Sequence, residues 1–115
     1  MSVSVPVVTV LTLAVPGPIV LSGLTLAPRK PRAGRQLAST HVVLRDGIRV
    51  RTGRVACRGR IDGRRLTVLV HRFRRGKATC VWQLPAAATG KLVSAVVVVR
   101  KGFMRARAPF RARVA

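Results

Sequence analysis

The C-terminal part of the chain alternates strictly between apolar and other residues. Its apolar positions are Met104, Ala106, Ala108, Phe110, Ala112 and Val114, and arginines occupy four of the positions between them. Successive side chains of a β-strand point to opposite faces, so this period of two predicts a strand with one buried face. No segment of the chain keeps a helical period over several turns. The alternation therefore favours an all-β fold.

The same period recurs from Ile19 onward, with turn residues between the runs. Asp46-Gly47 and Asp62-Gly63 are tight-turn dipeptides, and a central strand covered on both faces would explain the nearly continuous apolar run 92–99. The pattern predicts a brief strand at 48–50 and longer strands over 19–27, 36–44, 54–61, 66–73, 78–84, 92–99 and 104–114. About seven strands at this spacing in 115 residues describe a single Ig-like antiparallel β-sandwich.

The composition changes sharply after residue 27. Residues 1–27 carry no charged side chain, and a basic, proline-punctuated stretch begins at Pro28. We therefore expect an uncharged apolar lead-in, or the end of an upstream segment, over 1–27 and the sandwich module over 28–115. Thr25-Leu26-Ala27 could serve as a signal-peptide cleavage site, but no basic residue precedes the apolar run. Prolines at 6, 16 and 18 interrupt that run, so we expect no membrane-spanning helix.

The charge balance is extreme, with 23 Lys and Arg against 2 Asp and Glu, a formal net charge of +21. Such a field attracts polyanions, including nucleic acid, anionic lipid headgroups and acidic cell-wall or glycan polymers. Arginine-rich usage is also typical of a GC-biased genome in which arginine is the default solvated residue. The placement of the arginines distinguishes these interpretations. An even coat favours a structural spacer, whereas a stripe on one sheet favours a binding surface.

Nucleic-acid recognition lacks its usual sequence features. Trp82 and Phe110 fall on the inward faces of their predicted strands, leaving Phe73 and Phe103 as candidate exposed aromatic residues. Single-strand binders stack bases on exposed aromatic side chains, and the chain has no zinc-finger or recognition-helix motif. Binding through a diffuse charge would depend steeply on salt and would be indifferent to the identity of the polyanion.

Cys57 and Cys80 both fall on inward faces, which predicts a disulfide through the core, with two buried free thiols as the alternative. If strand 66–73 lay between them in one sheet, the cysteines would be about 9–10 Å apart, whereas a disulfide needs Cα atoms within about 7 Å. Their strands must therefore lie in opposite sheets, or adjacent in one sheet. Disulfides persist in oxidising compartments, so we expect an extracytoplasmic protein.

The remaining reactive side chains do not form a site. His41 and His71 are predicted to be half-exposed strand residues, and neither has a ligand spacing to a cysteine that suggests zinc. The two carboxylates, Asp46 and Asp62, are both explained by turns, and the chain has no Asn to orient a histidine. We expect no catalytic residue, no cofactor and no metal, and therefore a protein that is not an enzyme.

Several short elements of residues 28–115 resemble the small Ig-like modules of secreted or surface-anchored multidomain bacterial proteins, especially those of high-GC actinobacteria. The similar elements are Pro31-Arg32-Ala33-Gly34, Gly53-Arg54-Val55-Ala56-Cys57, Gly76-Lys77-Ala78-Thr79-Cys80-Val81-Trp82-Gln83-Leu84-Pro85, Gly90-Lys91-Leu92 and the closing run 110–114. The resemblance implies a non-catalytic spacer, stalk or adhesive role beside neighbouring domains of a larger protein, and it transfers no functional residues.

Overall fold

The computed structural model describes residues 17–115, which form nine β-strands and, within this range, no helix. The strands are β1 (Ile19–Ala27), β2 (Gln36–Arg45), β3 (Ile48–Arg49), β4 (Arg54–Ile61), β5 (Arg64–Arg65), β6 (Thr67–Arg74), β7 (Lys77–Gln83), β8 (Leu92–Lys101) and β9 (Met104–Arg113). Seven of them are full strands, and β3 and β5 have two residues each. The expected all-β fold is confirmed.

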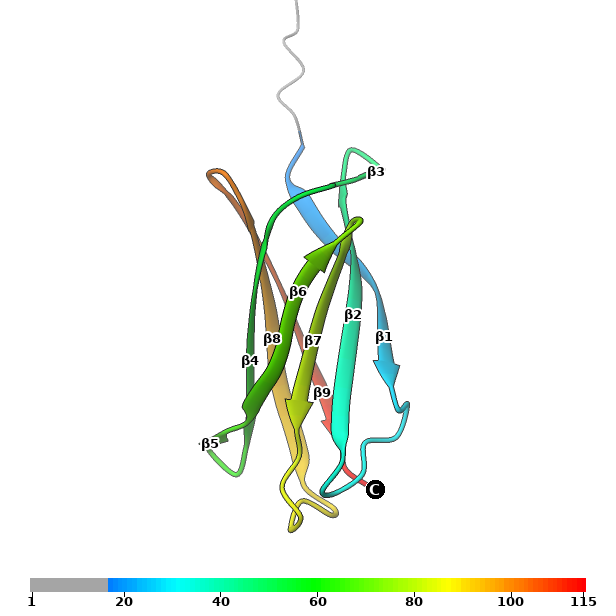
Figure 1. Ribbon diagram of the computed structural model, residues 1–115, viewed down its shortest axis with the longest axis vertical. Helices are drawn as coiled ribbons and strands as arrows, with labels where there is room; N and C mark the ends of the chain where they lie inside the picture. Colours follow the sequence, from blue (N-terminus) through cyan, green and yellow to red (C-terminus); the bar gives the residue numbers. More distant parts are fainter. Residues whose placement is uncertain (1–16) are drawn as a thin grey trace, which may run out of the picture.

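The strands form two antiparallel sheets that pack face to face (Figure 1). One sheet has the order β1-β2-β7-β6, with β3 paired to β2, and the other has the order β5-β4-β8-β9. The seven full strands thus follow the order of the constant-type immunoglobulin sandwich, ABED on one sheet and CFG on the other. The expected Ig-like sandwich is confirmed, and β5 is a short addition beside β4.

Residues 19–27 belong to the sandwich. As β1 they pair antiparallel with β2, from Ile19 opposite Arg45 to Ala27 opposite Ala38. The lead-in assignment therefore does not hold for this segment, because its apolar side chains supply an edge strand and Ile19 is buried. Residues 1–16 of the predicted lead-in lie outside the described residues.

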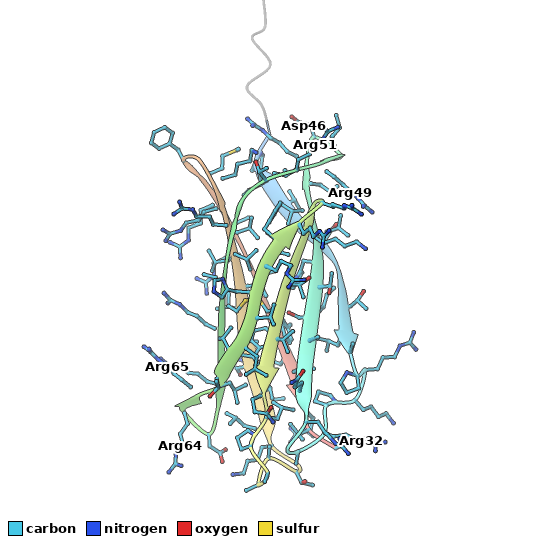
Figure 2. All side chains as sticks on the ribbon, in the orientation of Figure 1. Arg32, Asp46, Arg49, Arg51, Arg64 and Arg65 are labelled. Carbon is cyan, nitrogen blue, oxygen red and sulfur yellow. A yellow bond between two sulfur atoms is a disulfide. The ribbon has the colours of Figure 1, made fainter. Side chains whose placement is uncertain are left out.

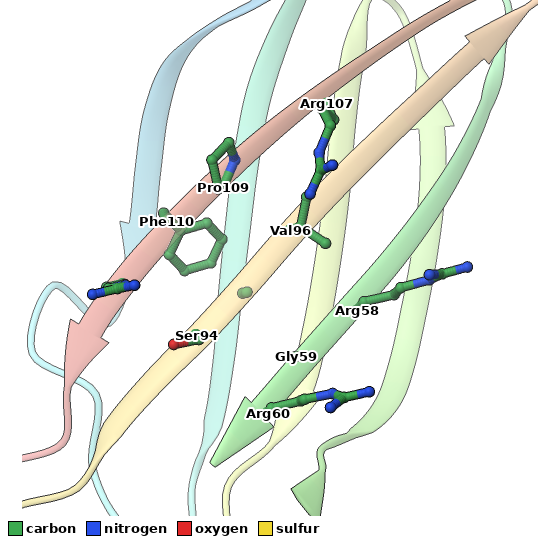
Figure 3. A pocket seen from close by; sticks show the side chains of 10 residues that line it. Arg58, Gly59, Arg60, Ser94, Val96, Arg107, Pro109 and Phe110 are labelled. Atoms are coloured by element: carbon green, nitrogen blue, oxygen red, sulfur yellow. The ribbon is translucent and has the colours of Figure 1, made fainter. Parts of the chain in front are cut away.

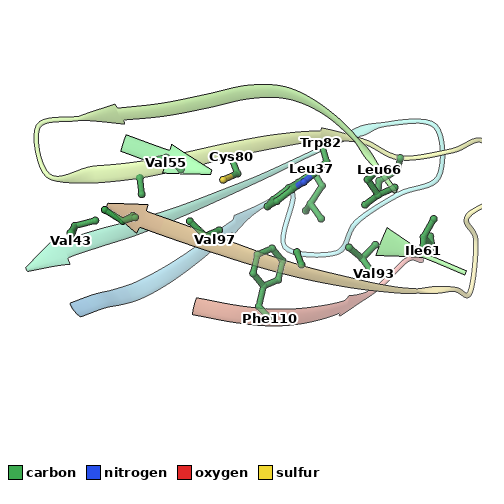
Figure 4. Close-up of a cluster of buried hydrophobic side chains, with 14 of the residues drawn as sticks. Leu37, Val43, Val55, Ile61, Leu66, Cys80, Trp82, Val93, Val97 and Phe110 are labelled. Carbon is green, nitrogen blue, oxygen red and sulfur yellow. The ribbon is translucent and has the colours of Figure 1, made fainter. Parts of the chain in front are cut away.

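The core lies between the inward faces of both sheets, and Trp82 of β7 is at its centre (Figure 4). Its indole makes an edge-to-face contact with Phe110 of β9, with ring centroids 5.7 Å apart. Trp82 is fully buried and Phe110 is 8% exposed, which confirms the inward faces expected for both. Aromatic pairs in this geometry add about 0.5–1.5 kcal/mol beyond the area they bury.

A glycine on β4 makes room for the tryptophan. A Cβ atom built on Gly59 would lie 3.0 Å from Trp82 Nε1, 3.1 Å from Leu66 Cδ1 and 3.2 Å from Trp82 Cδ1. The space on the inward side of Gly59 is therefore occupied by the side chains of Trp82, from β7, and Leu66, which lies between β5 and β6. The indole thus packs directly against the backbone of the opposite sheet.

The inward face of β2 carries two polar residues, Ser39 and His41, which are buried. The expectation that His41 is half-exposed is therefore wrong. The strict alternation of β2 places His41 on the same face as Leu37 and Val43, and the position determines its burial. The imidazole lies 6.4 Å from the Phe110 ring centroid, and desolvation by burial lowers the pKa of His41.

Candidate functional site

The outer face of the β5-β4-β8-β9 sheet is covered by arginines. Strand register fixes which side chains share this face, because residues opposite each other in a ladder point the same way. Arg58 of β4, Val96 of β8 and Pro109 of β9 form one such row across the sheet, and Arg60, Ser94 and Arg111 form the next. We call this surface the arginine face. Its nine exposed arginines are Arg54, Arg58, Arg60, Arg65, Arg100, Arg105, Arg107, Arg111 and Arg113.

The arginines flank an apolar floor. β4 and β9 both pair with β8, so their arginine rows stand about 9–10 Å apart. Val96 and Val98 of β8 lie between the rows, and Ala56 of β4 and Pro109 of β9 extend this apolar surface to either side. Val98 points away from the core and yet is only 6% exposed, as expected when long aliphatic arginine stems cover their apolar neighbours. The surface is thus a shallow trough with charged walls.

One part of this trough is an open hollow of about 690 Å³ (Figure 3). Arg58 and Arg60 line it from β4, and Arg107 and Arg111 line it from β9. Its floor includes Ser94 and Val96 of β8 together with the backbone of Gly59. The hollow is therefore lined by arginines from two strands that are distant in the sequence.

The other sheet has a different outer face. Its ladder places mostly uncharged side chains there, such as Thr25, Ala38, Thr40, Thr79 and Gln83. Four cations share this face, and all of them lie toward one end of the sandwich: Arg49, Arg72, Arg74 and Lys77. The charge is therefore segregated between the sheets.

Neither acid of the chain lies on the arginine face. Asp62, in the β4–β5 turn, forms an ion pair with Lys91, and Asp46, in the β2–β3 turn, accepts a hydrogen bond of 3.1 Å from the Gly17 N–H. Since the chain has no third carboxylate, no side chain of the protein neutralises this surface. Nine like charges on one sheet repel one another, and a bound anion would relieve that repulsion. Outside the face, other basic residues such as Arg32 and Arg64 extend from loops and strand ends (Figure 2).

The two cysteines form a disulfide between the sheets. Cys57 of β4 and Cys80 of β7 are bonded with their Cα atoms 5.8 Å apart, which confirms the predicted bond. Of the two arrangements that the sequence left open, the strands adopt the one in opposite sheets. Cys80 is fully buried, whereas Cys57 is only half-buried. His71 is an exposed residue opposite Cys80 in the β6–β7 ladder. Because both sulfurs are bonded to each other, neither is a thiolate nucleophile for this histidine.

Within residues 17–115, no cluster of three or more His, Cys, Asp or Glu side chains could hold a metal ion. The same part of the chain has no helix long and apolar enough to cross a membrane.

No protein-family model matches the chain, and none of the curated proteins matches it. Among solved structures, the chain is similar to the crystal structure of the S-layer protein SbsC domains 4 and 5, with a TM-score of 0.43 and 16% sequence identity. The match covers 84% of this chain and 54% of that chain, so the chain spans about half of that structure. A likeness this distant assigns no family, ligand or activity.

Sequence reasoning identified the outward arginines but not the surface that they form. The alternation in β4 and β9 shows that Arg58 and Arg107 point outward from their own strands. It does not show that β4 and β9 flank the same strand, because that depends on how the 42 residues between them, 62–103, cross between the sheets. The nine arginines of the arginine face come from β4, β5, β8 and β9 and share one face in space.

Proposed function

We propose that the chain is a non-catalytic, extracytoplasmic Ig-like module that binds an acidic glycan through its arginine face. One observation carries this proposal. Nine exposed arginines share one sheet face without an acidic partner, while the opposite sheet has four cations near one end. A structural spacer does not need such a segregation, and a solvated coat would distribute its charges over both sheets. The segregation therefore favours an adhesive module over a passive spacer.

The chemistry of the trough favours a particular kind of polyanion. Guanidinium groups bind sulfate, phosphate and carboxylate through paired hydrogen bonds. Rows of arginine on β4 and β9 suit a linear polymer with anionic groups along both edges. The floor of Val96 and Pro109 suits the less polar faces of sugar rings. Bases would instead require an exposed aromatic stacking platform, whereas the aromatic side chain that lines the hollow, Phe110, is only 8% exposed and packs edge-to-face on Trp82.

The disulfide supports an extracytoplasmic location. A bond between Cys57 and Cys80 crosses the two sheets, and such bonds persist where the environment is oxidising. Acidic polymers of the cell envelope or of an extracellular matrix would be available there. Location and ligand are therefore compatible.

The proposal is tested by two matched triple variants. Arg58→Gln, Arg107→Gln and Arg111→Gln together remove three charges around the hollow, and Arg72→Gln, Arg74→Gln and Lys77→Gln remove three from the opposite sheet. Affinity for a heparin oligosaccharide is measured by calorimetry at physiological salt. The first triple variant should bind about tenfold more weakly or worse, since each exposed charged contact contributes roughly 0.2–1 kcal/mol. The second should bind much like the original protein.

Equal losses in the two variants would show that only the diffuse field binds, and would contradict the proposal. Duplex DNA of matched charge density supplies the comparison of ligands. If DNA binding survives physiological salt while heparin is released, the ligand is a nucleic acid and the glycan proposal is wrong. Exposed substitutions of this kind usually change stability by less than about 0.5 kcal/mol, so both variants should remain folded.

A further inference from the structure

The turn between β8 and β9 presents a fully exposed phenylalanine. Phe103 has a relative exposure of 110%, so it contributes nothing to the core. The turn itself does not require it. Lys101 pairs with Met104, which leaves Gly102 and Phe103 as the two central residues, and only Gly102 has a positive φ, of 57°. A two-residue turn with glycine first accepts a polar residue second.

A second apolar side chain is exposed at the same end of the sandwich. Ile48, which follows the β2–β3 turn, is 73% exposed. The last residues of β2 and of β8 both lie at this end of the sandwich, as Figure 1 shows. The Lys101 ammonium donates hydrogen bonds to the Thr52 hydroxyl, at 2.8 Å, and to the Thr52 carbonyl, at 3.1 Å. These bonds join the β8–β9 turn to the segment that precedes β4. We call this end, with its β2–β3 and β8–β9 turns, the docking end.

Basic side chains lie near each apolar residue. Arg54, Arg100 and Lys101 line one hollow together with Phe103, and Arg49 and Arg51, which follow Ile48 in the sequence, lie at the same end (Figure 2). The one acid at this end, Asp46, already accepts a hydrogen bond from the Gly17 N–H. Proteins bind anionic bilayers through the insertion of apolar side chains and through the attraction of cations to the headgroups. Exposed apolar side chains with cations nearby supply both contributions. Long arginine and lysine stems can follow an apolar tip while keeping their charges at headgroup level.

The chain also enters the described fold at the docking end. Gly17 lies beside Asp46, and β1 starts opposite the last residue of β2.

We propose that the docking end binds an anionic lipid surface, with Phe103 and Ile48 entering the interface and the surrounding cations contacting headgroups. This site shares Arg54 and Arg100 with one end of the arginine face, but it lies away from the hollow and does not rest on the function proposed above. In this orientation the strands run away from the bilayer. The hollow between β4 and β9 then stays open to a polymer while the turns contact lipid.

The test places a tryptophan at each end of β8. Phe103→Trp puts the probe at the docking end, and Leu92→Trp puts a matched probe at the other end of the same strand, where Leu92 is 37% exposed. The native Trp82 is fully buried and contributes the same background to both. Each variant is mixed with vesicles of brominated phosphatidylcholine and phosphatidylglycerol at physiological salt. We expect strong quenching of the probe at 103 and little quenching at 92.

A pair of polar variants measures the affinity. Phe103→Ser should lower partitioning onto phosphatidylglycerol-containing vesicles by about tenfold, because it removes the burial of one large apolar side chain. Leu92→Ser should leave partitioning unchanged.

Equal quenching of the two tryptophan probes would show that the protein lies flat on its arginine face, and would overturn the proposal. Absence of quenching at 103 would overturn it as well. If Phe103→Ser abolishes self-association in sedimentation and leaves vesicle binding intact, the occupant is a second copy of the chain instead.

Discussion

Adding one methyl group at Gly59 should destabilise the fold. The new Cβ would lie 3.0–3.2 Å from three atoms of Trp82 and Leu66, compared with about 3.5–4.0 Å for an ordinary carbon contact. The indole is held from another side by Phe110, so it cannot shift freely. Overpacking of this kind costs about 1–3 kcal/mol, and the lower backbone entropy of alanine in the unfolded chain offsets about 0.4–1 kcal/mol. We expect a net loss of roughly 1–2 kcal/mol.

The free energy of unfolding of Gly59→Ala is measured by urea titration, with circular dichroism and the fluorescence of Trp82, the one tryptophan of the chain, as the two signals. In a thermal melt of a domain of about 100 residues, the same loss of stability lowers the Tm by roughly 5–15 °C. Ala56→Val is the matched control, because it adds methyl groups to the exposed face of the same strand and should change stability by less than about 0.5 kcal/mol. A Gly59→Ala protein as stable as the original would refute the tight packing of the indole against β4.

Three further perturbations test the core. Phe110→Ala should destabilise by about 3–5 kcal/mol because it empties a buried site, whereas Arg111→Ala on the opposite face should stay within about 0.5 kcal/mol; equal effects in urea melts would contradict the register of β9. Burial lowers the pKa of His41 from its usual 6.5, so the unfolded chain binds the proton more readily. The free energy of unfolding should therefore fall as the pH drops below about 6.5, until the folded-state pKa is passed, and His41→Phe should flatten this part of the profile; an unchanged profile would rule His41 out as its source. Non-reducing mass spectrometry should find no free thiol, and replacing Cys57 and Cys80 by alanine should cost about 3 kcal/mol; two thiols that are readily alkylated in the folded protein would contradict the disulfide.

Strands such as β2, β4 and β7 were predictable because one face of each is buried. Arg54–Ile61 alternates so regularly that the bounds of β4 match the expectation. β6 was harder to define: its start was expected at Leu66, but the strand begins at Thr67, and its pairing with β7 shifts between Val68 and Val70. A shift of this kind disrupts the period of two.

The burial of His41 and the arginine face depend on tertiary structure. A histidine among apolar residues on one strand face is assigned to solvent by its polarity, but the face of β2 that carries Leu37 and Val43 is sealed by the opposite sheet. Likewise, local periodicity gives the direction of Arg58 and Arg107 on their own strands. Only the pairing of both strands with β8 brings them to one surface.

The most direct test of the arginine face is an NMR titration of the arginine side-chain Nε–Hε signals with a heparin oligosaccharide at physiological salt. A bound sulfate or carboxylate should shift the signals of the guanidinium groups that contact it. The structure predicts shifts for Arg58, Arg107 and Arg111, with Arg72 and Arg74 of the opposite sheet unaffected. Uniform shifts over both sheets would contradict the account, because they would mean that the glycan senses the net charge and not one surface.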